Sequence, residues 1–382
     1  MVTPCPLIEV HGTPRERGVQ HGRLAAERIR RGIAHYSAQL ERARFGPAEL
    51  RAAVAEYLPV IEAFDARYVD EMRGIAAGAE VDFEQIVLLN ARTELLQIAS
   101  RRAKAHGPVD DDPDGCTGLV VLPQASESGR LIHAQNWDWK AECAETAIVL
   151  KVRRDDGPDL LTFTEAGALG RCGFNAAGIT ITANYLESER DYQRGIGVPL
   201  ALIRRKVLEQ EHLALAMRVV YTTRKSASNN MIVSHAQGIV IDFECAPDES
   251  FQVHAQDGLL VHANHWQSPV ALAKLTDTGI LATPDSLYRD LRVRGLLEPR
   301  IGRIGRADVK SALFDDFASP WSVCRPPRPS LSENLSATVA MIVMEPLLGV
   351  MEVAMLPAQN REFSRFTLET TLRSVVPQPL PA

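Results

Sequence analysis

The chain has 382 residues, of which 46% are hydrophobic and 24% are charged, so it holds enough apolar material for one large or two ordinary globular domains. This composition excludes a disordered, collagen-like or coiled-coil protein. The formal net charge is −6, which leaves no excess of positive charge to bind nucleic acid or an anionic membrane surface.

The first hundred residues predict mostly helix. After a short β-favouring run at residues 7–10, apolar residues recur at helical spacing from Pro14, which suits the first turn of a helix, to about residue 44. Asp82 is a plausible N-cap for a later helix. We expect these further helices at residues 47–64, 66–79 and 82–98.

The pattern changes at residues 101–115, which contain two prolines, two glycines and four aspartates and predict an exposed loop. Beyond it, short β-favouring runs are separated by turn residues, with helices predicted between groups of strands. Such segregation favours an α+β layered sandwich. The strands are expected at 116–122, 131–139, 147–153, 160–164, 179–185, 230–234, 238–244, 251–254, 259–263, 338–345 and 349–356, and the helices at 199–223, 284–297 and 308–317.

The cysteines form no C-x-x-C pair and no repeated spacing, which argues against a disulfide framework or a zinc ribbon. They are Cys5, Cys116, Cys143, Cys172, Cys245 and Cys324. The start of the sequence lacks the regions of a secretory signal, and no apolar run approaches the roughly 18 residues that span a bilayer. We therefore expect a cytoplasmic protein whose cysteines are, by default, buried apolar residues.

Cys116 is the exception that we consider, because it follows Gly115 where the predicted loop meets a predicted strand. A cut after Gly115 would make this cysteine an N-terminal residue, whose α-amino group, with a pKa of roughly 7.7–8.0, could take the proton of the thiol. A thiol needs such activation because the thiolate is the nucleophile. Glycine before the cut places no Cβ in the way of the attack. Composition alone still favours the alternative, a buried strand cysteine without a catalytic role.

A set of motifs along the chain favours the catalytic interpretation. The motifs are Gly12…Gly18-Val-Gln-His-Gly22, Glu71-Met-Arg-Gly-Ile-Ala-Ala-Gly-Ala, Leu89-Asn-Ala-Arg-Thr-Glu-Leu, Gly115-Cys116-Thr117, Gln135-Asn136-Trp137-Asp138, Gly173-Phe-Asn-Ala-Ala-Gly178 and His262-Ala-Asn-His265. In order and approximate spacing, from about residue 9 to 356, they resemble the acyl-coenzyme A:6-aminopenicillanic acid acyltransferase (isopenicillin N acyltransferase) peptidase family. This resemblance implies an N-terminal nucleophile (Ntn) hydrolase with a four-layer αββα sandwich and self-cleavage before the nucleophile.

The resemblance also implies a site. Cleavage at Gly115–Cys116 would give a mainly helical segment, 1–115, and an Ntn-hydrolase core, 116–382, which stay associated as one compact domain. Asp138 would hold the Cys116 amine and thiol, and Asn264 would donate its amide to the oxyanion. Asn184 resembles a second site asparagine. Arg289 resembles the site arginine, with Arg292 and Arg325 as alternatives.

Other residues narrow the substrate class. Bile salt hydrolases and the acid ceramidase group resemble each other in having arginine where this chain has Gln135, so bile-acid and ceramide substrates are disfavoured. Trp137, Trp139 and Glu165 are candidate substrate-binding residues, although alternating aromatics on a strand also fit a half-buried strand. His262 and His265 are expected to point to opposite faces of a strand, which argues against a shared metal ion.

The sequence thus predicts an amide hydrolase or acyltransferase that acts on a small N-acyl amine through a thioester on Cys116, with no metal and no organic cofactor. Hydrolysis is the favoured outcome because water is always present. Serine-hydrolase and nucleotide-binding motifs are absent from the sequence. Two alternatives stay open: a penicillin-type acyl-CoA-dependent N-acyltransferase, and an uncut, non-catalytic binding protein on the same scaffold. A homo-oligomer also stays open.

Overall fold

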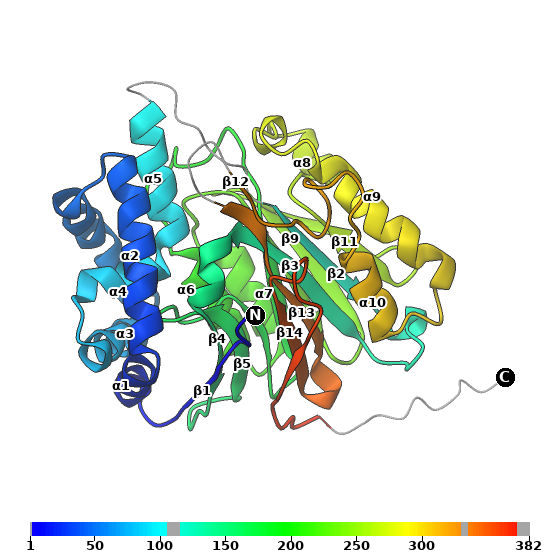
Figure 1. Cartoon of the computed structure of the whole chain (residues 1–382), viewed down its shortest axis with the longest axis horizontal. Coiled ribbons are helices and arrows are strands. Elements are labelled where there is room, and N and C mark those ends of the chain that lie inside the picture. The colour runs from blue at the N-terminus through cyan, green and yellow to red at the C-terminus, as the bar shows by residue number, and fades with distance from the viewer. Residues whose placement is uncertain (1, 105–114, 330–334, 373–382) are drawn as a thin grey trace.

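The computed structural model describes residues 2–104, 115–329 and 335–372, and within these it stacks two β-sheets face to face with helices on both outer sides (Figure 1). The predicted α+β class and the four-layer αββα order are therefore confirmed. Most of the predicted loop, residues 105–114, lies outside the described residues.

The first sheet has the strand order β1-β4-β5-β6-β7-β8-β9-β10. β1 and β4 are parallel, and the other neighbours are antiparallel. Its strands are β1 (Leu7–Val10), β4 (Ala147–Val152), β5 (Leu160–Glu165), β6 (Cys172–Asn175), β7 (Ile179–Tyr185), β8 (Asn229–His235), β9 (Ile239–Cys245) and β10 (Ser250–Val253). The N-terminal segment thus contributes β1 to the edge of a sheet built from the rest of the chain.

The second sheet has the order β11-β2-β3-β13-β14-β15, with β12 paired to β13. Its strands are β2 (Cys116–Val121), β3 (Ile132–Lys140), β11 (Leu259–His262), β12 (Arg328–Pro329), β13 (Leu335–Glu345), β14 (Val350–Met355) and β15 (Ser364–Thr367). β2 and β3 face β7 of the first sheet, so the start of β2 lies near the space between the two sheets.

The helices divide between the two outer layers. α6 (Leu200–Leu208) and α7 (Leu213–Thr222) pack on the first sheet, while α9 (Ser286–Leu297) and α10 (Arg306–Leu313) pack on the second. The N-terminal helices lie together on the side of α6 (Figure 1). They are α1 (Pro14–Leu24), α2 (Ala26–Arg42), α3 (Pro47–Ala79), α4 (Phe83–Asn90) and α5 (Arg92–Lys104); α8 (Pro269–Leu272) is a single turn.

Two of the predicted helices are interrupted. The helix expected at residues 14–44 breaks at Ala25, and the one expected at 82–98 breaks at Ala91. Alanine has the highest intrinsic helix propensity, so these breaks come from tertiary packing that local sequence does not reveal. The expected boundary near residue 65 is present, since Asp65 within α3 has a non-helical φ of −164°. The prediction of a loop from residue 101 was wrong at its start, because α5 continues to Lys104. β6, β12, β15 and α8 were not predicted.

The glycines of the N-terminal motifs have a packing role. A Cβ built on Gly18 of α1 would lie 2.0 Å from the Glu71 carbonyl oxygen of α3, and one on Gly22 would lie 2.2 Å from the Ile75 carbonyl oxygen. Gly74 and Gly78 meet α1 in the same way from the other side. Only glycine allows these two helix backbones to approach so closely.

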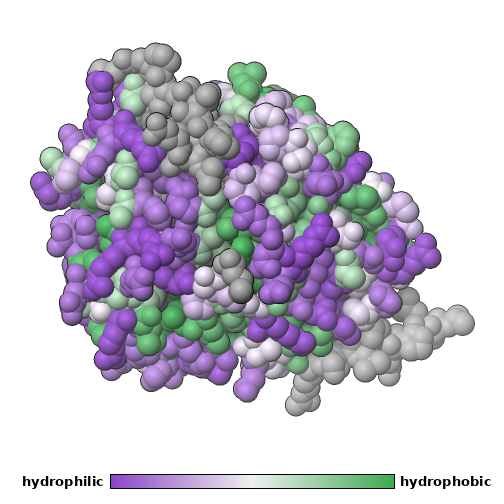
Figure 2. Space-filling view, viewed as in Figure 1, coloured by the Kyte–Doolittle hydropathy of each residue, from purple (hydrophilic) through white to green (hydrophobic). Residues whose placement is uncertain are grey.

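The face of the molecule in Figure 2 is mostly hydrophilic, with apolar residues scattered among the polar ones. The large apolar cluster lies inside, between the first sheet and its helices and between the two sheets. Within the described ranges, no helix is both long and apolar enough to cross a membrane.

Candidate active site

Cys116 is the first residue of β2 and lies directly across from Trp137 of β3. Directly paired residues on antiparallel strands share a face, so the Cys116 side chain lies on the side of Trp137. Trp137 packs edge-on against Phe163 of β5, with ring centroids 5.6 Å apart. The thiol therefore points into the space between the sheets, and the preceding residue, Gly115, faces the opposite way.

Two predicted site residues hold the Cys116 backbone from the helical side. The Cys116 N–H donates to Asn264 Oδ1 at 2.7 Å, and its carbonyl oxygen accepts from Arg289 Nη1 at 2.7 Å. Arg289 Nη2 also donates to Asn264 Oδ1 at 2.8 Å, which joins the two groups. Asn264 follows β11 and Arg289 lies on α9, so the loop and the helix together fix both polar backbone groups of Cys116.

The three candidate arginines occupy different places. Arg289 contacts Cys116 as described, and its Nε lies 2.7 Å from Asp285 Oδ2. Arg325 is fully buried, is ion-paired with Asp285, and has its Nε 3.4 Å from Asp138 Oδ2. Arg292 is paired with Asp315 instead, and its side chain is 39% exposed. The geometry thus brings Arg289 to the cysteine and Arg325 to the aspartate, and it leaves Arg292 out.

Asp138 lies on β3, on the opposite face from Trp137. Its Oδ1 accepts from the Thr338 hydroxyl of β13 at 2.7 Å. Burial raises the pKa of the Asp138 carboxyl to about 6, against the opposing effect of the Arg325 and Arg289 charges. A carboxyl group that titrates near neutrality is typical of a functional site.

Gly115 is packed tightly against this aspartate. A Cβ at Gly115 would lie 2.6 Å from Arg325 Nη2, 2.7 Å from its Cζ and 2.9 Å from Asp138 Oδ2. Gly115 is buried, contrary to the expectation that the exposed loop extends to this residue. The Asp138 carboxylate therefore faces the residue just before Cys116, and glycine alone fits there.

Asn184 and Gln135 connect the two sheets beside the cysteine. Asn184 of β7 donates to the His262 carbonyl oxygen at 2.9 Å, and Gln135 of β3 donates to Asn184 Oδ1 at 2.8 Å. A Cβ on Gly118 would lie 3.5 Å from Asn184 Nδ2, which places Asn184 beside β2 two residues beyond Cys116. Gln135, the residue whose identity disfavoured bile-acid and ceramide substrates, thus orients the side-chain amide of Asn184.

One of the three candidate substrate-binding residues, Glu165, lines a narrow cavity, and arginines from the lining of this cavity cover the other two, Trp137 and Trp139. The Arg171 guanidinium lies over the Trp137 ring at 4.0 Å, and Arg92 lies over the Trp139 ring at 4.7 Å. Arg92 Nε is 2.7 Å from Glu165 Oε2. The residues that line the cavity are Leu89, Asn90, Arg92, Thr93, Glu94, Thr164, Glu165, Ala168, Gly170, Arg171, Leu200, Ala201 and Arg204. Arg92 lies within one of the sequence motifs, but neither it nor Arg171 or Arg204 was identified as a site residue, because the three come from elements far apart in the sequence.

The expectation for the two histidines was wrong. The rings of His262 and His265 stack, with centroids 6.3 Å apart and planes inclined by 19°, so both face the same side. β11 ends at His262, and strand alternation does not extend to His265. Their partners are Glu244 for His262 Nε2 and Ser286 for His265 Nδ1, each at 2.8 Å. In the part of the chain that the structure describes, no group of three or more His, Cys, Asp or Glu side chains is arranged to hold a metal ion.

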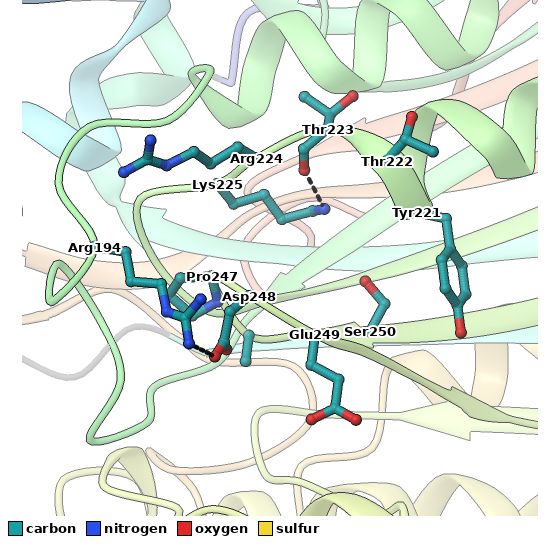
Figure 3. Close-up of a pocket in the computed structure, with 11 residues that line it drawn as sticks. Arg194, Tyr221, Thr222, Thr223, Arg224, Lys225, Pro247, Asp248, Glu249 and Ser250 are labelled. Atoms are coloured by element: carbon teal, nitrogen blue, oxygen red, sulfur yellow. Dashed lines mark hydrogen bonds and ion pairs between the residues drawn. The ribbon is translucent and has the colours of Figure 1, made fainter.

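A larger cavity, of about 480 Å³, lies at the end of α7 and the turn between β9 and β10 (Figure 3). Its charged groups are satisfied locally: Arg194 pairs with Asp248 at 2.8 Å, and Lys225 Nζ donates to the Thr223 and Val220 carbonyl oxygens. None of the predicted site residues lines it. This larger cavity is therefore separate from the predicted site around Cys116.

Comparison with known proteins identifies the family of this chain and proteins that are similar to it. Residues 125–354 match the family model described as acyl-coenzyme A:6-aminopenicillanic acid acyl-transferase. The chain is 30% identical, over 325 residues, to the acyl-coenzyme A:6-aminopenicillanic-acid-acyltransferase 40 kDa form of Emericella nidulans, covering 83% of this chain and 84% of that protein. It is 23% identical over 336 residues to an uncharacterized protein of Archaeoglobus fulgidus, covering 78% of this chain and 55% of that protein.

Two solved structures are similar to it in part. A variant of conjugated bile acid hydrolase from Clostridium perfringens has 12% identity and a TM-score of 0.48, covering 66% of this chain and 92% of that chain. Penicillin V acylase from Agrobacterium tumefaciens has 16% identity and a TM-score of 0.41, covering 63% of this chain and 83% of that chain.

Proposed function

Because the chain belongs to the acyl-coenzyme A:6-aminopenicillanic acid acyltransferase family, we propose that it is a self-processing Ntn hydrolase that cleaves small N-acyl amines through a thioester on Cys116. The observation that carries the proposal is the placement of Cys116. Its backbone is clamped by Asn264 and Arg289, a buried carboxylate faces the residue before it, and its side chain lies on the face of Trp137, which is covered by Arg171 from the lining of a cavity.

Maturation would begin within the intact chain. Cys116 Sγ attacks the Gly115 carbonyl carbon, the C–N bond between Gly115 and Cys116 breaks, and the thiol proton ends on the Cys116 nitrogen. Water then hydrolyses the thioester, which leaves a carboxyl group on Gly115 and a free thiol and amine on Cys116. Asp138 supports this step because its carboxylate lies next to Gly115, where it can hold the new ammonium group.

Turnover would repeat the same chemistry on a substrate. The α-amino group of Cys116 takes the thiol proton, the thiolate attacks the amide carbonyl, and the amine leaves with that proton. Water resolves the acyl-enzyme. Each step uses groups of the chain and water. All six cysteines are free thiols in the structure, which suits the reducing, cytoplasmic setting that we propose for this chemistry.

Acyl transfer is the second candidate, since the Emericella nidulans relative is named as an acyltransferase. It differs only in the last step, where a bound amine rather than water would take the acyl group.

The proposal is tested on the purified chain by intact mass and amide turnover. We expect fragments that begin at Met1 and Cys116 and remain together on gel filtration, an iodoacetamide adduct at Cys116 that abolishes activity, and amine released from short acyl, β-alanyl or phenylacetyl amides. A single 42.0 kDa chain that stays intact on prolonged incubation and does not react at Cys116 would instead support the uncut binding protein.

Gly115→Ala is expected to slow cleavage at least about tenfold, because its Cβ would overlap the Arg325 guanidinium and the Asp138 carboxylate and force them apart. The measurement is the uncut fraction by mass against time after synthesis. Gly295→Ala is the matched control: it lies on α9 with no atom within 4 Å of the new Cβ, and it should cleave normally. Normal cleavage of Gly115→Ala would show that the contact with Asp138 does not matter.

A further inference from the structure

The cavity on the thiol side carries more positive than negative charge. Three guanidinium groups line it, from Arg92 on α5, Arg171 before β6 and Arg204 on α6, against two carboxylates, Glu94 and Glu165. Arg92 is ion-paired with Glu165, which also accepts from the Tyr36 hydroxyl at 2.6 Å. Glu94 accepts from the Leu200 N–H at 2.8 Å and so is partly occupied by the start of α6.

Arg171 and Arg204 are the other two arginines of this cavity. Among the described residues, neither forms an ion pair with a carboxylate, and the buried Nε of each has no hydrogen-bond partner. Arg171 lies on the Trp137 ring, and Arg204 is held close enough to Arg171 for the two charges to repel. Burial lowers the pKa of both guanidinium groups, that of Arg204 to about 9.

Such an arrangement of charges is unfavourable, although the Glu94 and Glu165 carboxylates offset part of the repulsion at longer range. Removing a cation from water without a partner costs free energy, and a second cation nearby adds to the cost. A bound anion would remove both penalties. Guanidinium groups are suited to this because their planar N–H donors match the two oxygens of a carboxylate.

The pair lies where a substrate would lie. Arg171 covers Trp137, the cross-strand partner of Cys116, and both arginines interact electrostatically with Cys116. A group held by Arg171 and Arg204 would therefore be attached to a molecule whose reacting carbonyl is at the thiol.

We propose that the Arg171–Arg204 pair binds a carboxylate of the substrate, so that the amides cleaved at Cys116 carry an acidic group a few atoms from the scissile bond. This inference rests on the proposed function for the reaction, but the anion site itself does not depend on it. The cavity has a free volume of about 20 Å³, close to one water molecule, so side chains of its lining must move when a carboxylate enters.

Reaction products test the site without turnover. Glutarate and pentanoate differ only by the distal carboxylate and represent the acyl side, whereas β-alanine and propylamine differ in the same way and represent the amine side. In calorimetric titrations of the mature protein, we expect the member of one pair that carries the additional, distal carboxylate to bind at least about tenfold more tightly than its isostere. The pair that shows the preference identifies the side of the amide. Equal binding within both pairs would overturn the proposal.

Variants assign the preference to these residues. Arg204→Met and Arg171→Met keep the aliphatic part of each side chain and should remove the preference, while Arg204→Lys keeps the charge and should retain part of it. Arg303→Met is the control, because Arg303 is exposed, follows α9 and does not line the cavity, and within the described ranges its side chain hydrogen-bonds to the Pro299 carbonyl oxygen at 3.4 Å; this variant should bind as wild type. A preference that survives both methionine variants would also overturn the proposal.

The failure of this inference and that of the proposed function give different results. Amides with and without the carboxylate that are cleaved at the same rate would leave the hydrolase and remove the anion site. Arginine-dependent binding of glutarate or β-alanine by a chain that is never cut and forms no thioester would leave the anion site and remove the hydrolase.

Discussion

Cys116→Ala is expected to leave the chain uncut and to abolish amide turnover, by at least about 10³-fold, because it removes the only atom that we propose to attack both the Gly115 carbonyl and the substrate. The substitution should disturb the fold little, since alanine fits the same buried strand position and the backbone contacts of Cys116 with Asn264 and Arg289 do not involve its side chain. Intact mass gives the cleavage result and released amine gives the turnover result, from the same sample.

Cys245→Ala is the matched control for this prediction. Cys245 is a fully buried thiol on β9, where burial raises its pKa, so it should be inert and its loss should leave cleavage and turnover unchanged. Cys116→Ser keeps a weaker nucleophile and should cleave slowly with little turnover. Two fragments and full activity from Cys116→Ala would show that another residue is the nucleophile.

The start of β2 could be placed from sequence because local signals agree there. A stretch rich in aspartate, glycine and proline ends at Gly115, β-branched and apolar residues follow Cys116, and the strand begins at that residue. The motif after it places Asp138 on the next strand, and strand alternation then puts Trp137 and Asp138 on opposite faces. Local sequence signals were enough to predict this part of the site.

The partners of these residues could not be predicted in the same way. Arg289 and Arg325 were both candidates in the sequence, and only the packing of α9 on the second sheet brings one to Cys116 and the other to Asp138. Arg171 and Arg204 were missed because they come from the turn before β6 and from α6, which meet only when the first sheet is complete. The stacking of His262 on His265 depends on where β11 ends, to within one residue.

The groups around Cys116 lie on two faces of the second sheet, and we assign self-cleavage to one face and substrate binding to the other. Asp138, Arg325 and Gly115 lie on the face of the second sheet opposite to the thiol, whereas the thiol shares its face with Trp137 and the arginine-lined cavity. Groups that act on the peptide to be cut and groups that would receive the substrate therefore approach Cys116 from two sides. Asn264 is placed to serve both, because it contacts the backbone nitrogen between them.

Asn264→Asp is expected to lower kcat by about 10²–10³-fold with a much smaller change in KM, because it removes an oxyanion donor and keeps the position of the side chain. Asn264 Oδ1 accepts from the Cys116 N–H and from Arg289, and a carboxylate oxygen can do the same. Asn264 Nδ2 has two hydrogens, of which the Tyr185 carbonyl oxygen takes one at 2.9 Å. The second is the hydrogen that we propose to stabilise the tetrahedral intermediate, and an ionised aspartate cannot supply it.

The same intermediate forms during self-cleavage, so the rates of this variant must be divided by the fraction of chains with a free Cys116 N-terminus, measured by mass. Asn264→Ala, which removes the acceptor as well, should reduce both cleavage and turnover further. Asn360→Asp, at a half-buried position where the side-chain oxygen accepts from the Glu362 N–H, makes the same chemical change away from the site and should leave kcat unaltered. If Asn264→Asp turned over as fast as wild type per mature chain, the oxyanion would have to be stabilised by backbone N–H groups alone, and Asn264 would be a positioning residue for the Cys116 amine.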